Sequence, residues 1–240
     1  MSDVLPNIDQ LDPDGALRES ADRVDGHTRA GFMRRAGAFV GAGAVAGMVP
    51  GGVAMAQGGL AQSDTAILNF ALTLEYLEAA FYKEAVDNGS LSGETRTFAK
   101  VVADHESQHV AALKKVLGSD AVKRPSFGFK GTTSDQSLFQ QTAITLEDTG
   151  VRAYLGQTPN IKSKTVLKSA ASILPVEAWH AGWIREIVGR GSAPVPAPTA
   201  ADTPATIPQT LAAVQATGFV QSMLPALPGA PLDGAPGVAG

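Results

Sequence analysis

The chain has 240 residues, of which 44% are hydrophobic and 18% charged, as in a soluble globular protein with one sizeable domain or two small ones. Its net charge of −4 argues against nucleic-acid binding, which needs a broad basic face. It contains no cysteine, which excludes disulfides, thiolate zinc sites, iron–sulfur clusters and thiol nucleophiles, so any metal ion must be held by oxygen and imidazole.

Residues 1–56 predict a cleavable export signal. A polar, acidic stretch is followed by three arginines, Arg29, Arg34 and Arg35. A mildly apolar, glycine-rich run over residues 36–49 comes next, too short for a membrane span of roughly 20 residues. Ala54-Met55-Ala56 is a small-x-small cleavage site, so we expect the mature chain to begin at Gln57 with no stable membrane span.

The arginines resemble those of twin-arginine signals, in either of two registers. Arg34-Arg35 is a literal pair, whereas residues 28–34 fit the wider pattern better except that Ala30 replaces the second arginine. The alternative is a basic loop before a buried helix. The interpretation as an export signal predicts that the chain interacts with the twin-arginine machinery and has a periplasmic or extracellular location.

Beyond Ser63 the apolar spacing predicts four helices. Their expected ranges are 63–88, 93–118, 134–159 and 162–189. The loop of about fifteen residues between the second and third is long for a hairpin and favours a crossover connection. Pro175 falls inside the fourth helix and should bend or divide it.

The C-terminal part differs in composition from the four predicted helices. Residues 191–208 are rich in Pro, Ala and Thr and predict a linker, residues 210–218 predict a short helix, and residues 224–240 a flexible tail. No strand pattern of any length is present. The expected fold class is therefore all-α, with a four-helix bundle over residues 57–190 and an appended segment over residues 191–240.

The two halves of the bundle repeat one another. Residues 71–75, ending in Glu75, match residues 143–147, ending in Glu147, and Tyr82 and Tyr154 keep the same offset. A Glu-x-x-His motif follows in each half, and its residues are Glu106, His109, Glu177 and His180. Two such motifs arise by chance about once in a hundred chains of this composition. We expect the halves to be related by an approximate twofold axis.

The repeated acidic residues lie on the apolar faces of their helices. Residues three apart share a face, so Glu106 and His109 point toward the core beside Val102, and Glu177 and His180 do so beside Ile173. Four carboxylates in one core need compensation, because burial of an unpaired charge costs several kcal/mol. Two divalent cations would balance them, and oxygen-rich ligation with one imidazole each suits iron or manganese.

Two Glu, each followed by Glu-x-x-His, resemble the ligand set of ferritin-like di-iron carboxylate proteins. Residues 74–78, 153–156 and 177–182 are also similar to exported ferritin-like proteins of the desiccation-related family. The resemblance covers roughly residues 64–189 and implies a ferritin-like four-helix bundle. The metal ligands that it implies are Glu75, Glu106, His109, Glu147, Glu177 and His180.

Several neighbouring residues keep two interpretations. Glu78 could be a metal ligand, but its repeat partner is Gly150, which favours a supporting or surface role. Tyr82 and Tyr154 either bond ligand carboxylates or simply fill the core. His105 points about 100° away from Glu106 and is expected to be a surface or packing residue. The remaining expectations are packing of Trp179 and Trp183 on helices or another subunit, and an Asp148–Arg152 surface pair.

The functional prediction is an exported di-iron or di-manganese oxidoreductase acting on O2 or peroxide, either a ferroxidase or a peroxide scavenger in stress protection. The alternatives are a non-catalytic, desiccation-related protein that the metal stabilises, and a di-manganese catalase. No catalytic residue is assigned, and homo-oligomerisation is left open by the sequence.

Overall fold

The computed structural model describes residues 60–189 and 196–222, which belong to one compact unit, Val49–Gly240. The predicted export signal, its cleavage site and the predicted tail lie outside the described residues. Within them the structure is helical, and its only β contact is an isolated antiparallel bridge between Phe127 and Val220. None of these helices is both long and apolar enough to cross a membrane.

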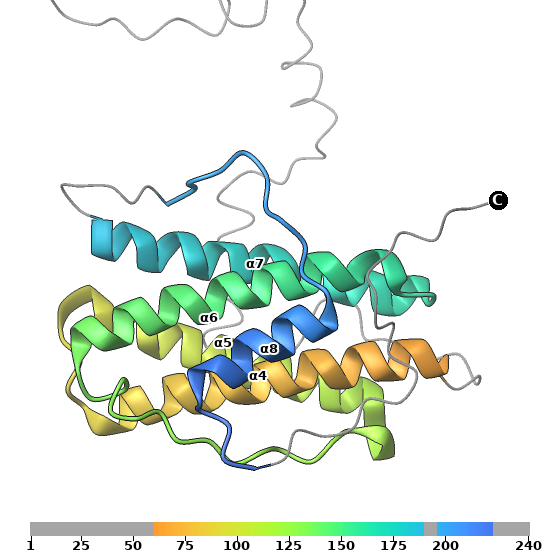
Figure 1. Ribbon diagram of the computed structural model, residues 1–240, viewed down its shortest axis with the longest axis horizontal. Coiled ribbons are helices and arrows are strands. Elements are labelled where there is room, and N and C mark those ends of the chain that lie inside the picture. Colours follow the sequence, from red (N-terminus) through yellow and green to blue (C-terminus); the bar gives the residue numbers. More distant parts are fainter. Residues whose placement is uncertain (1–59, 190–195, 223–240) are drawn as a thin grey trace, which may run out of the picture. The chain divides into compact units, whose positions relative to one another are not determined.

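Four long helices form the bundle, and the predicted all-α fold is confirmed (Figure 1). Helix α4 packs against α5 and α6 against α7, while α4 also contacts α6 and α5 contacts α7. Short 3-10 turns, η1 (Gly118–Asp120) and η2 (Thr158–Asn160), follow α5 and α6. The helices are α4 (Gln62–Asn88), α5 (Gly93–Leu117), α6 (Gln136–Gln157) and α7 (Lys164–Gly189).

The connection from α5 to α6 is a crossover, as its length predicts, and it runs along the bundle from one end to the other (Figure 1). Asn69 on α4 fixes its beginning, because its amide donates to the Asp120 carbonyl at 2.9 Å and accepts from the Val122 N–H at 2.8 Å. Phe129 from the same loop packs edge-on against Phe81. This cover explains why α4 is buried along most of its length.

The C-terminal segment packs on the bundle through helix α8 (Ile207–Thr217), which contacts α6. Ile207, Val214 and Phe219 join the hydrophobic core. Upstream of α8, the Ala205 N–H donates to the Arg152 carbonyl at 2.9 Å. A Cβ at Gly156 would lie 1.9 Å from the Ala205 carbonyl oxygen, so only glycine permits this close approach.

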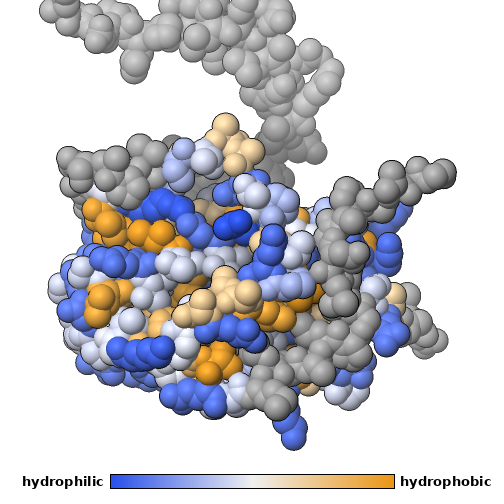
Figure 2. Space-filling model, in the orientation of Figure 1, coloured by the Kyte–Doolittle hydropathy of each residue, from blue (hydrophilic) through white to orange (hydrophobic). Residues whose placement is uncertain are grey.

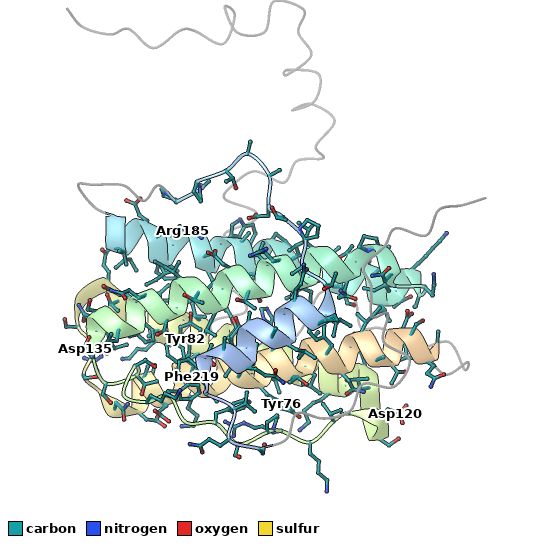
Figure 3. All side chains as sticks on the ribbon, viewed as in Figure 1. Tyr76, Tyr82, Asp120, Asp135, Arg185 and Phe219 are labelled. Carbon is teal, nitrogen blue, oxygen red and sulfur yellow. The ribbon has the colours of Figure 1, made fainter. Side chains whose placement is uncertain are left out.

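One local expectation from the sequence is wrong. Asp148 pairs with Arg185 of α7 rather than with Arg152, whose Nε donates to the Thr203 carbonyl at 3.1 Å (Arg185 is labelled in Figure 3). Arg152 binds the C-terminal segment instead, and the spacing of residues along α6 could not predict where that segment lies. Of the two outcomes predicted at Pro175, division of the helix is excluded, because α7 continues through this residue.

Aspartates near the starts of α6 and α4 have different roles. Asp135 caps α6, because its Oδ1 accepts from the Leu138 N–H at 2.8 Å. Asp64 does not cap α4. It is fully buried, and its two oxygens accept the N–H groups of Lys162 and Ser163 just before α7, each at 2.8 Å. Asp64 therefore ties the start of α4 to the start of α7.

The surface of the bundle is mixed in polarity. Figure 2 shows one face, on which hydrophilic side chains separate smaller hydrophobic patches. The acidic and imidazole groups of the repeated motifs are nearly absent from the surface, since all four glutamates are 0% exposed.

Replacement of Asp64 should test this tie between helices. Asp64→Ala leaves two partly buried N–H groups without their carboxylate acceptor, so we expect the free energy of unfolding to fall by about 2–3 kcal/mol. Denaturant unfolding measures the loss. The control is Asp87→Ala, which breaks only the exposed Lys83 pair and should cost under about 1 kcal/mol. Equal losses in the two variants would contradict the assigned role.

Candidate metal centre

Six predicted side chains converge in the middle of the bundle, one set from each half. The buried stripe of α7 runs through Val166, Ala170 and Ile173 to Glu177 and His180, so helical periodicity alone turns the motif inward. The same holds for α5, where Glu106 continues the stripe of Phe98 and Val102. Glu75 and Glu147 enter from α4 and α6.

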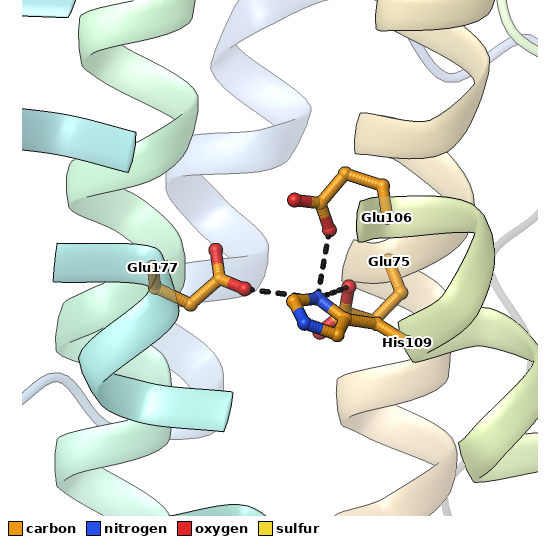
Figure 4. A group of neighbouring side chains, drawn as sticks. All are labelled: Glu75, Glu106, His109 and Glu177. Carbon is orange, nitrogen blue, oxygen red and sulfur yellow. Dashed lines mark hydrogen bonds and ion pairs between the residues drawn. The ribbon is translucent and has the colours of Figure 1, made fainter. Parts of the chain in front are cut away.

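One group of four, here called position A, consists of Glu75, Glu106, His109 and Glu177 (Figure 4). The three carboxyl groups meet at the Nδ1 atom of His109. This atom lies 3.1 Å from Glu106 Oε2, 3.1 Å from Glu177 Oε1 and 3.2 Å from Glu75 Oε2. The ligand atoms of the group lie within 4.8 Å of one another, a spacing that could hold a metal ion.

The second group, position B, consists of Glu106, Glu147, Glu177 and His180 and meets the same spacing. His180 Nδ1 lies 3.1 Å from Glu106 Oε1 and 3.2 Å from Glu147 Oε2. Glu106 and Glu177 belong to both positions. The two Glu-x-x-His glutamates are thus placed to bridge the positions, whereas Glu75 and Glu147 each serve one.

The donors do not suffice for these acceptors. A single Nδ1–H on His109 faces three carboxylate oxygens and can donate well to one of them. Glu106 Oε1 and both carboxylate oxygens of Glu177 are buried without a hydrogen-bond partner in the described part of the chain. Orphaned carboxylate oxygens are costly in a core, and a cation among them would satisfy them.

Burial and mutual repulsion set the pKa values of the carboxyl groups. Desolvation and the charge of Glu75 raise the pKa of Glu106 to about 7, although the neighbouring imidazoles of His109 and His180 oppose this. Desolvation, Glu106 and Glu75 raise the pKa of Glu177 well above its ordinary value. Burial also favours the neutral form of Glu75, but the nearby His109 outweighs it and lowers the pKa.

The surroundings of the two histidines favour their charged form. Burial alone would lower the pKa of His180, but the carboxylates of Glu106 and Glu147 beside its Nδ1 raise it to about 10. Burial would also lower the pKa of His109, but the charge of Glu75, followed by contacts with Glu106 and Glu177, raises it well above its ordinary value. Without metal, the two imidazolium groups are thus the only compensating charges that the core supplies among the described residues.

Two tyrosines bind the outer carboxylates in a reciprocal arrangement. Tyr82 of α4 donates to Glu147 Oε1 on α6, and Tyr154 of α6 donates to Glu75 Oε1 on α4. Both side chains are buried, and Tyr82 is labelled within the bundle in Figure 3. Of the two interpretations of these tyrosines, carboxylate binding across the bundle is the one confirmed, and it follows the twofold repeat.

Glu78 and His105 lie closer to the centre than the sequence suggested. Glu78 is 3% exposed, and its pKa is raised well above the ordinary value by desolvation and then by Glu177 and Glu147. His105 is half-buried, with Nδ1 2.8 Å from His180 Nε2. The expectation of a surface or packing histidine missed this contact, because a helical wheel of α5 does not show where α7 lies.

The two tryptophans differ from each other. Trp183 packs edge-on against Phe98 with ring centroids 5.3 Å apart, as expected for a residue between helices. Trp179 is 70% exposed on this chain.

The metal-free protein should lose stability as the pH rises from 5 to 8. A folded-state pKa raised from 4.5 to about 7 at Glu106 stabilises the fold below pH 4.5, and this contribution is lost as the pH passes 7, a change on the order of 3 kcal/mol. The raised pKa of His180 acts in the same direction above pH 6.5. Denaturant unfolding of chelator-treated protein across this range measures the trend, and a rise in stability would contradict it.

Removal of either tyrosine hydroxyl should destabilise the fold. Tyr82→Phe and Tyr154→Phe each leave a buried carboxylate oxygen without its donor, and we expect a cost of about 1.5–3 kcal/mol for each. Tyr76→Phe is the matched control, since its hydroxyl makes only a 3.4 Å bond to the Val122 carbonyl. Thermal or denaturant unfolding compares the three, and a control as destabilised as the others would refute the carboxylate role.

Comparisons with known proteins agree with this geometry. The model of the ferritin-like domain matches residues 63–190, which is more than half of the chain and includes α4 to α7. Among curated proteins, no match was found. The extent of the domain match, together with the four-helix bundle, shows that the chain belongs to the ferritin-like family.

Proposed function

We propose that this ferritin-like protein binds two iron or manganese ions through six residues and acts as an oxidoreductase. The proposed ligands are Glu75, Glu106, His109, Glu147, Glu177 and His180. The observation that carries the proposal is the convergence of each histidine Nδ1 on carboxylate oxygens that the protein's own protons cannot satisfy.

The donor set fits such ions. Four carboxylates from four helices can balance two divalent cations, and the two imidazoles complete the ligation without added charge. A set of oxygen and imidazole without thiolate suits iron or manganese better than structural zinc. A dinuclear iron or manganese centre would supply redox chemistry toward O2 or peroxide.

The chain's own residues would prepare this site in three ways. Glu106 and Glu177 come from opposite halves and belong to both positions, so they fix the spacing between the positions. Tyr82 and Tyr154 hold Glu147 and Glu75 through single oxygens and leave the other oxygens directed inward. The apolar core around Phe98, Val102 and Ile184 excludes bulk water and strengthens these electrostatic interactions.

The biological setting that we propose is outside the cell membrane, in stress protection. Support comes from the arginines and the small-x-small site of residues 1–56, which lie outside the described residues. Export in the folded state would suit a protein that acquires its metal before it crosses the membrane. As a specific activity we favour Fe(II) oxidation by O2 or peroxide scavenging.

Metal content is the first test. Protein produced with iron or manganese supplied should contain about two ions per chain by elemental analysis. Chelation should lower its thermal midpoint by several degrees, because the carboxylates are then compensated by the two imidazolium groups alone. Glu106→Gln should lose metal, whereas the exposed Glu186→Gln of α7 should retain it. Metal-free wild-type protein after supplied expression would refute the proposal.

The activity requires a separate experiment. Aerobic oxidation of added Fe(II), followed by absorbance, should be fast in wild-type protein and fall to the uncatalysed rate in Glu106→Gln, because that substitution removes a carboxylate shared by both positions. Rapid O2 evolution from peroxide by manganese-loaded protein would instead identify a catalase. Tightly bound metal with neither activity would identify a stabilising centre.

A further inference from the structure

The repeat that builds the site is broken at two places next to the metal ligands. Glu78 on α4 corresponds to Gly150 on α6, and His105 on α5 corresponds to Val176 on α7. In each pair one half offers a polar group and the other offers none. Both polar members contact or face groups of position B.

Glu78 occupies space that Gly150 leaves open. A Cβ at Gly150 would lie 3.1 Å from Glu177 Oε2 and 3.4 Å from Glu78 Oε1, so both carboxyl groups approach the bare backbone there. Glu177 and then Glu147 exert the largest charge effects on Glu78, ahead of Glu106 and Glu75. The fifth carboxyl group thus lies beside Glu177 and approaches α6 at Gly150, about one helical turn after Glu147 of position B.

His105 supports the imidazole of position B. For His180 Nδ1 to offer a lone pair to a metal ion, the ring hydrogen must be on Nε2, and this N–H then needs an acceptor. His105 Nδ1 lies 2.8 Å from that atom. Val176 offers no such acceptor to His109, and Nε2 of His109 has no hydrogen-bond partner within residues 60–189 and 196–222.

Enclosure differs in the same direction. The His180 side chain is 3% exposed and that of His109 is 11% exposed. Position B therefore combines a more enclosed imidazole with an oriented ring and an additional carboxyl group nearby. Each of these features favours a bound cation.

We propose that the two metal positions are unequal, and that position B, supported by Glu78 and His105, binds the first and tighter ion. The inference rests on the proposed metal binding and adds which position fills first. In this account His105 is a positioning residue that acts through His180, and Glu78 contributes negative charge beside the shared Glu177.

An anaerobic titration of the metal-free full chain with Mn(II), with free Mn(II) followed by electron paramagnetic resonance, tests the order of filling. We expect two steps that differ at least about tenfold in dissociation constant. His109→Ala should keep the tight step and His180→Ala should lose it. Two equal steps, or a tight step that survives only in His180→Ala, would overturn the inference, whereas no binding by the wild type would instead refute the proposed function.

The supporting residues are tested in the otherwise unchanged chain. Glu78→Gln and His105→Leu should each weaken the tight step by about 10- to 100-fold and leave the weak step nearly unchanged. His105→Asn, whose Oδ1 can accept near the place of Nδ1, should restore most of the affinity. Glu186→Gln is the exposed control. The inference fails if His105→Asn binds as weakly as His105→Leu, or if both steps weaken together.

Discussion

The structure depends on the electrostatics of a core in which four fully buried glutamates face two imidazoles. Burial of so many carboxyl groups is expensive, and the raised pKa values of Glu106, Glu177 and Glu78 reflect that cost. The surrounding bundle, with its aromatic packing and crossover loop, provides the stability that tolerates it. The proposed dinuclear metal binding would explain why the chain maintains such a site, because the same groups that repel one another would become ligands that share two cations.

The twofold repeat explains how a small number of interactions organises this core. Each half provides one carboxylate, one Glu-x-x-His motif and one tyrosine, and each tyrosine binds the carboxylate of the other half. The halves are thereby linked through the site itself, in addition to the contacts of α4 with α6 and of α5 with α7. Departures from the repeat at Glu78 and His105 give the two positions different surroundings. The repeat thus accounts for the assembly of the site, and the two departures are the basis of the proposed difference in affinity between the positions.

Much of the fold and the candidate ligand set could be predicted from the sequence, because helical periodicity and the repeat are both local signals. Glu177 is buried for the same reason as Ile173 and Ile184, and the spacing shows this without a structure. Long-range choices could not be predicted. Asp64 could have capped its own helix but binds the start of α7, and Asp148 pairs with Arg185 instead of its neighbour Arg152. His105 was missed for the same reason, since its partner lies on a helix 75 residues away.

The central claim is that the six side chains enclose two metal ions, and anomalous X-ray diffraction from crystals of the iron- or manganese-loaded full chain tests it most directly. The account predicts two anomalous peaks inside the bundle, one between Glu75 and His109 and one between Glu147 and His180, with Glu106 and Glu177 in contact with both. Peaks confined to the surface, or a metal-loaded crystal with no peak among these side chains, would contradict it.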